Sequence, residues 1–161
     1  MKIALKYGLA VTLVVVAWVV IVRHVMGVGA DSKANVIAPI LFNVAQILAI
    51  FLGMIRRKND AGGELSFKEG MKTGVAVSFV YAASACLVFV IEYLIYGPKL
   101  LLAEAGASAR PLWQTAAMAY TGLFLGSLIF GVIYSTVISF FLARRRKHNS
   151  SADYTDFTDS T

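Results

Sequence analysis

Two amide side chains, Asn43 and Gln46, interrupt a long apolar stretch of the sequence. They are three residues apart, so they would lie on one side of an α-helix, and amides in apolar surroundings need hydrogen-bond partners. One interpretation is a polar lining for the path of a substrate. The other is hydrogen bonding between helices, worth about 0.6 to 2 kcal/mol, which fixes how each helix is rotated. We favour hydrogen bonding, and the substrate path stays the alternative.

Two charged residues, Arg23 and Glu92, lie near the ends of other apolar stretches. If these stretches are helices, each residue adds 1.5 Å along the axis. Arg23 then lies about 24 Å from the start of its stretch at Tyr7, and Glu92 about 28 Å from the start of its stretch at Thr73, so the two residues would lie at similar heights in a bundle. We predict an ion pair between them, with extension of the Arg23 side chain to lipid headgroups as the alternative. Breaking a partly buried pair strands one charge, so Arg23→Ala and Glu92→Ala should each destabilise the protein, and the double change should be milder than their sum.

The remaining polar residues do not form a set that indicates catalysis. The sequence has no pair of carboxylates in the middle of its apolar stretches and no His-x-x-x-His motif. Its two histidines, His24 and His148, are expected at opposite ends of the molecule, so they cannot bind one metal ion together. Cys86 is the only cysteine, which excludes a disulfide within the chain and a cysteine-based metal cluster. We therefore expect a protein that is not an enzyme and that carries no cofactor and no metal.

The elements that must position these residues follow from the hydropathy of the chain. Of 161 residues, 58% are hydrophobic and only 15% are charged, a balance typical of membrane proteins. Lipid offers the backbone no hydrogen-bond partners, so apolar stretches of about 20 residues must cross it as helices. We predict an all-α membrane bundle over residues 1–147 and a disordered cytoplasmic tail over 148–161. The predicted transmembrane helices cover about residues 7–26, 36–55, 73–96 and 115–142.

The basic residues predict the orientation of the chain in the membrane. Eleven Lys and Arg residues fall on one side of the four stretches and four on the other, so the positive-inside rule places both termini and the middle loop in the cytoplasm. The clusters at 56–58 and 144–147 are explained by this role, although contacts with anionic lipids are an alternative. Because the charge lies at helix ends, the net charge of +6 does not indicate binding to nucleic acid.

Local motifs predict where the third helix begins and ends. Ser66 is followed three residues later by Glu69, the pattern of a capping box. The helix should therefore start in the cytoplasmic loop and continue without a break into the membrane. The pair Gly97-Pro98 should end it, and residues 99–110 are expected to hold a short helix at the membrane surface.

Small residues recur every four positions along two of the predicted helices. Such spacing lets helix backbones approach closely. In lipid the hydrophobic effect does not drive helices together, so close packing is the main source of contact between them. We expect packing within the chain, with a homo-oligomer interface through the fourth helix as the alternative. The fourth helix carries Gly122 and Gly126 on one stripe and Ser127, Gly131, Ser135 and Ser139 on another, and the third helix carries Gly74, Ser78 and Ala82.

Two short segments, together with the four-helix layout, resemble a known family. They are Lys6-Tyr7-Gly8, which runs into the first helix, and Leu65-Ser66-Phe67-Lys68-Glu69-Gly70-Met71-Lys72-Thr73-Gly74, which enters the third. The chain resembles, over residues 2–146, the bacterial membrane family named domain of unknown function 4199. The resemblance implies a protein of the bacterial inner membrane, and it implies no activity, ligand or site residue.

Two functional hypotheses follow from these features. The first is a non-enzymatic structural or accessory protein of the inner membrane, whose partners are the lipid bilayer and further copies of itself. The alternative is a small transporter or channel subunit that acts as a homo-oligomer, as in the small multidrug resistance family. That family uses a glutamate in its first helix, and the first predicted helix here has no acidic residue.

Overall fold

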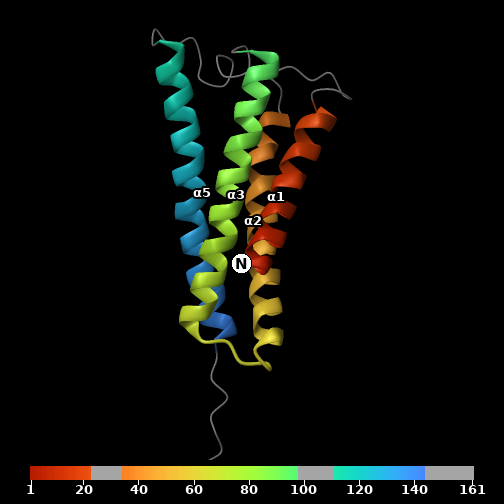
Figure 1. Cartoon of the computed structure of the whole chain (residues 1–161), viewed down its shortest axis with the longest axis vertical. Helices are drawn as coiled ribbons and strands as arrows, with labels where there is room; N and C mark the ends of the chain where they lie inside the picture. The colour runs from red at the N-terminus through yellow and green to blue at the C-terminus, as the bar shows by residue number, and fades with distance from the viewer. Residues whose placement is uncertain (23–33, 98–110, 144–161) are drawn as a thin grey trace, which may run out of the picture.

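A computed structural model describes residues 1–22, 34–97 and 111–143. Within these ranges the chain forms four long helices that run side by side (Figure 1). Each is long and apolar enough to cross a membrane, so the predicted all-α bundle of four transmembrane helices is confirmed. The helices are α1 (Lys2–Val20), α2 (Ala34–Asp60), α3 (Phe67–Tyr96) and α5 (Leu112–Leu142).

The helices extend beyond the predicted apolar stretches at several ends. Helix α2 continues past residue 55 to Asp60, and α3 begins at Phe67 rather than at residue 73. Hydropathy marks the part of a helix that lies in lipid, whereas the backbone stays helical until a cap or turn stops it. The predicted end of the first stretch, residues 23–26, lies outside the described residues, as do the surface helix at 99–110 and the tail.

Helix α3 has the ends that the sequence predicted. The Ser66 hydroxyl accepts a hydrogen bond from the Glu69 N–H at 3.2 Å, and the Ser66 N–H donates to Glu69 Oε2 at 3.4 Å. This reciprocal pair is a capping box. At the other end Gly97 has a φ of 73° and donates its N–H to the Tyr93 carbonyl at 2.9 Å, a left-handed conformation that favours glycine and stops the helix.

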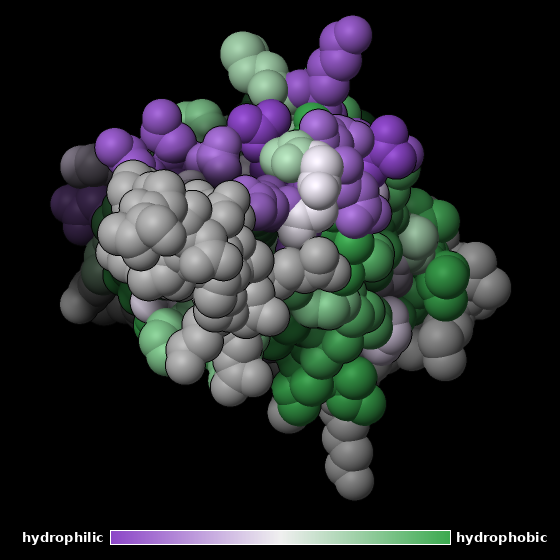
Figure 2. All heavy atoms as spheres, turned by 90° about the horizontal axis from the view of Figure 1, so that it is seen from below, coloured by the Kyte–Doolittle hydropathy of each residue, from purple (hydrophilic) through white to green (hydrophobic). Residues whose placement is uncertain are grey.

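The two ends of the bundle differ in charge. All Lys and Arg residues of the described chain lie in the half of the bundle that holds the α2–α3 connection. The end with this connection is here called the charged end, and Figure 2 shows hydrophilic side chains gathered there. Arg56 pairs with Asp60 at 3.2 Å and Arg57 with Glu69 at 3.4 Å. Lys58 donates a hydrogen bond at 3.2 Å to the carbonyl of Leu142, the last residue of α5. Arg57 thus links α2 to α3 and Lys58 links α2 to α5, whereas the Arg56 pair lies within α2.

Small residues join α3 to α5 in the half of the bundle next to the charged end. We call this half the charged half. A Cβ added to Gly70 would lie 2.5 Å from the Ser139 hydroxyl, and one added to Gly74 would lie 2.5 Å from Met54 Cε and collide with Ser135. Three successive contacts, one on each turn, therefore depend on the absence of a side chain. The pairs are Gly70 with Ser139, Gly74 with Ser135, and Ser78 with Gly131.

Helix α1 packs against α3 by a similar close approach. A Cβ on Gly8 would lie 2.7 Å from Val80 Cβ and 2.9 Å from the Val77 carbonyl oxygen. One turn further along, the hydroxyls of Thr12 and Ser84 are 2.6 Å apart. These contacts surround a core of buried apolar side chains that includes Val11, Val15, Ile50, Met54 and Val77.

Candidate functional site

The half of the bundle away from the charged end is here called the far half. A cavity of about 460 Å³ lies there among the four helices. Sites for small molecules have volumes of about 300 to 1,000 Å³. Its lining comes from the end of α1, the first half of α2, the second half of α3 and the first two thirds of α5. Most of the lining is apolar, with a small number of polar side chains, and this composition is typical of ligand sites.

The cavity exists because α5 carries glycines where side chains would otherwise project into it. Gly122 and Gly126 both line the cavity, and a Cβ added at either position would meet nothing within 4 Å. The prediction that these two glycines pack closely within the chain is therefore corrected. Gly131, five residues after Gly126, is the glycine of this helix that contacts α3, through Ser78. A homo-oligomer interface through Gly122 and Gly126 stays a prediction.

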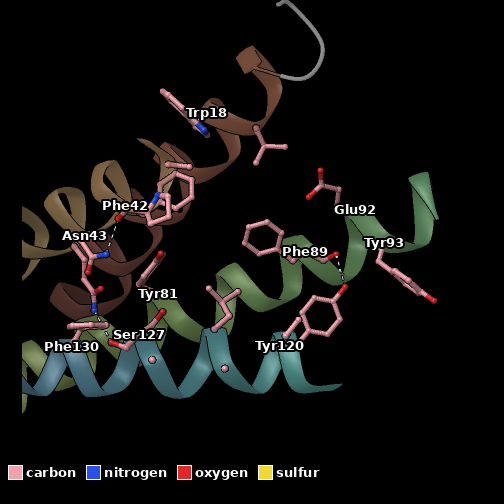
Figure 3. A pocket seen from close by; sticks show the side chains of 18 of the residues that line it. Trp18, Phe42, Asn43, Tyr81, Phe89, Glu92, Tyr93, Tyr120, Ser127 and Phe130 are labelled. Atoms are coloured by element: carbon pink, nitrogen blue, oxygen red, sulfur yellow. Dashed lines mark hydrogen bonds between the residues drawn. The ribbon is translucent and has the colours of Figure 1, made fainter. Parts of the chain in front are cut away.

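Aromatic side chains form much of the wall and come from every helix of the bundle. Figure 3 shows Phe89 directed from α3 into the space toward α1 and α2. The Tyr120 hydroxyl donates a hydrogen bond to the Phe89 carbonyl at 3.4 Å and so links α5 to α3 beside the cavity. The aromatic lining residues are Trp18 of α1, Phe42 of α2, Tyr81, Phe89 and Tyr93 of α3, and Tyr120 and Phe130 of α5.

The floor of the cavity, near the middle of the bundle, contains the two amides. Gln46 is only 2% exposed, and its Nε2 donates to the Ser127 carbonyl at 2.9 Å and to the Ser78 hydroxyl at 3.3 Å. Asn43 donates from Nδ2 to the Pro39 carbonyl at 2.8 Å and accepts at Oδ1 from the Tyr134 hydroxyl at 3.0 Å.

The geometry agrees with hydrogen bonding between helices, and the path of a substrate stays a prediction. Gln46 joins α2 to α3 and α5, and Asn43 joins α2 to α5, so each makes a hydrogen bond between helices. Both also line the cavity. One pair of amides thus holds three helices together and gives the cavity a polar floor.

The far end of the cavity carries a carboxylate. Glu92 is 8% exposed and is the one charged side chain among the described residues of the lining. In Figure 3 it points from α3 toward α1. Glu92 takes part in an interaction within the chain. Its predicted partner, Arg23, lies outside the described residues, so that ion pair stays a prediction.

The aromatic wall was not predicted from the sequence. A signal for part of it exists, because Tyr81, Phe89 and Glu92 are separated by eight and three residues and so lie on one face of α3. On a transmembrane helix, however, an aromatic face is equally suited to lipid. Only the splaying of the neighbouring helices turns this face into the wall of a cavity.

Among the residues that the structure describes, groups with metal-binding chemistry do not gather at the site. In the described ranges no three His, Cys, Asp or Glu side chains are grouped so that they could hold a metal ion. The Cys86 thiol lies 3.7 Å from the Tyr120 carbonyl oxygen, as a weak hydrogen-bond donor. The arrangement of groups can bind a molecule through shape, aromatic faces and a few polar atoms.

Four apolar helices of membrane-spanning length define this chain as a multi-pass membrane protein. The chain matches the family described as Protein of unknown function (DUF4199) over residues 6–144, and it belongs to that family. The resemblance inferred from the sequence is thereby confirmed. No curated protein and no solved structure matches the chain.

Proposed function

We propose that this protein is a non-enzymatic accessory protein of the bacterial inner membrane that binds a small amphipathic molecule in the cavity of its far half. The observation that carries the proposal is the cavity itself. It has the volume of a ligand site, a mainly apolar and aromatic wall, and a small number of polar side chains. A molecule with an apolar body and a polar group would fill it best.

The charge distribution supports an orientation with the cavity toward the outer face. Cytoplasmic ends of membrane proteins are enriched in Lys and Arg, and all basic residues of the described helices lie in the charged half. Both termini would then be cytoplasmic. In intact cells, a cysteine introduced at Ser108 should react with an impermeant reagent and one introduced at Ser150 should not, and the reverse pattern would contradict the orientation.

The clusters of basic residues contribute to this orientation more than to a lipid-binding site. Arg56 and Arg57 have carboxylate partners within the chain, and Lys58 holds the end of α5. Contacts with anionic lipids would compete with these partners. We therefore assign ligand binding to the cavity and not to the charged end.

Filling the cavity provides the direct test. Gly126→Leu would place a side chain in the empty space without meeting a neighbouring atom at its Cβ, so it should reduce ligand binding and leave the melting temperature near that of the parent. Ala117→Leu, on a part of α5 that does not line the cavity, is the matched control and should bind as the parent does. Unchanged binding by the Gly126 variant would overturn the proposal.

A second function, transport across the bilayer by a homo-oligomer, is favoured by the one-sided position of the cavity. The cavity ends at the amide floor, and the charged half beyond it is closed by the contacts of α3 with α5. A carrier protein whose binding site is accessible from only one side of the membrane has a cavity that is closed toward the other side. Ligand flux into proteoliposomes, abolished by Gly126→Leu and kept by Ala117→Leu, would support transport, whereas binding without flux would leave the accessory function.

A further inference from the structure

The floor of the cavity contains a hydrogen-bond acceptor without a donor. The amide nitrogen of Gln46 has two hydrogens, one directed to the Ser127 carbonyl at 2.9 Å and the other to the Ser78 hydroxyl at 3.3 Å. Because a carbonyl can only accept, the Ser127 contact fixes which amide atom is nitrogen and thereby where the oxygen, Oε1, lies. This oxygen has no hydrogen-bond partner among the described residues, although the Gln46 side chain is almost fully buried.

Gln46 Oε1 keeps an open side, and that side belongs to the cavity. Within the described ranges, Ser135 Oγ is the one fully enclosed side-chain nitrogen or oxygen atom without a partner. Oε1 also lacks a partner, so it is not fully enclosed, and the cavity is the space that Gln46 borders. A buried acceptor without a donor costs free energy, which a ligand recovers when it brings a donor. The floor therefore favours a ligand with an O–H or N–H group at its inner end.

The second amide of the floor offers a donor beside this acceptor. Asn43 donates one amide hydrogen to the Pro39 carbonyl, and its other amide hydrogen has no acceptor among the described residues. Asn43 lies three residues from Gln46, on the same side of α2, and it also lines the cavity. A hydroxyl group can donate to Gln46 and accept from Asn43, whereas an ammonium group can only donate and an ether or ketone can only accept.

The surroundings of the floor favour a ligand group without charge. Glu92, the one charged residue in the described lining, lies fourteen residues along α3 from Ser78, the residue that binds Gln46, which is about 21 Å of helix. The described part of the floor thus has no charged side chain. A charged group inside a membrane is costly unless it has a partner of opposite charge, so the two amides are suited to a neutral hydroxyl.

From these features we infer that the ligand of the cavity is an uncharged apolar alcohol or phenol, held with its hydroxyl group at the amide floor. Its apolar body would lie between the aromatic side chains of the wall, toward the far end of the cavity. The inference rests on the proposed function, that the cavity binds a ligand, and adds the polar group of that ligand and its direction in the cavity. Gln46 and Asn43 are the residues that select it.

Three probes of similar shape and different hydrogen-bonding capacity test this inference. They are biphenyl-4-ol, 4-methoxybiphenyl, which accepts but cannot donate, and 4-methylbiphenyl, which does neither. Binding to the full chain in nanodiscs of zwitterionic lipid is measured by calorimetry at neutral pH, where the phenol is uncharged, and each affinity is corrected for partitioning into empty nanodiscs. The phenol should bind about tenfold more tightly than the methoxy probe. Equal affinities, or tighter binding of the methoxy probe, would overturn the inference.

The variant Gly126→Leu separates failure of the inference from failure of the proposed function. Equal binding of all three probes, lost in Gly126→Leu, would overturn the hydroxyl group and leave a cavity for any apolar molecule, such as a lipid acyl chain. Binding that Gly126→Leu does not change, or no binding beyond that of empty nanodiscs, would overturn both proposals. A preference for the phenol that is lost in this variant supports both.

Gln46→Met tests the source of the preference and keeps the volume of the side chain. It removes Oε1, so the phenol should bind no more tightly than the methoxy probe. Ser78→Ala is the matched control, because it removes a hydrogen bond of the same amide at a residue that does not line the cavity, and Ser127 still holds the amide nitrogen. This variant should keep the preference. A preference that survives in Gln46→Met, or that both variants lose equally, would overturn the role of the acceptor, and the comparison of probes on the parent holds whether or not Gln46→Met folds.

Discussion

The charged half and the far half of the bundle are built from the same four helices and differ in how small residues are used. In the charged half, Gly70 and Gly74 of α3 and Gly131 of α5 each lie against a serine of the facing helix. In the far half, Gly122 and Gly126 of α5 face open space that belongs to the cavity. A glycine in a membrane helix thus produces either a close helix contact or a void, according to what lies opposite.

This difference has an energetic consequence. Lipid is as apolar as the side chains, so helices in a membrane gain contact mainly through close packing and hydrogen bonds between them. The charged half supplies both, through the glycine and serine contacts and through Gln46 at its border with the cavity. We therefore expect that the stability of the bundle does not depend on filling the far half.

The largest expected effect comes from placing the same side chain in both halves. Gly131→Leu would drive a side chain into Ser78, so it should lower the free energy of unfolding by about 2 to 3 kcal/mol. Gly126→Leu, five residues away on the same helix, should change it by less than about 0.5 kcal/mol. Unfolding in mixed micelles, followed by circular dichroism, compares the two. Equal losses would abolish the distinction between the halves.

A smaller effect is expected at the border between the halves. Gln46→Met keeps the volume of the side chain and removes its hydrogen bonds to Ser127 and Ser78, so the free energy of unfolding should fall by about 1 kcal/mol. The control is Leu48→Met on the exposed face of α2, which should have little effect. A Gln46 variant as stable as this control would mean that the amide does not hold the helices together.

The smallest effect is expected at Ser135, inside the contact of α3 with α5. Its hydroxyl is buried and has no hydrogen-bond partner among the described residues. Ser135→Ala should therefore leave stability unchanged or raise it by less than about 1 kcal/mol, since an unpaired polar group is removed. Ser139→Ala is the comparison, because that hydroxyl lies 3.6 Å from Met54 Sδ as a donor. A loss above about 1 kcal/mol for Ser135→Ala would point to an additional partner.

Local features of the molecule were predictable from the sequence. The four helices follow from apolar stretches that only helices can carry through lipid. The start of α3 follows from Ser66 and Glu69, and its end from Gly97. Each of these features depends on residues that are neighbours along the chain, so no knowledge of the other helices was needed.

The candidate site required the arrangement of the helices. In sequence, Gly122 and Gly126 have the same four-residue spacing as Gly131 and Ser135, and both stripes predict close packing. The rotation and splay of α5 decide that the second stripe meets α3 and the first faces the cavity. For the same reason the sequence located Gln46 in the membrane but could not show that it binds Ser127, a residue 81 positions further along the chain.

The sequence by itself thus determined that the chain spans a membrane four times and carries its described positive charges in one half of the bundle, because hydropathy and charge act residue by residue. Only the tertiary structure decided that Trp18, Phe89, Tyr120 and Glu92 surround one space. Lipid accepts an aromatic side chain as readily as a protein interior does, so which faces turn inward depends on the few contacts that hold neighbouring helices together.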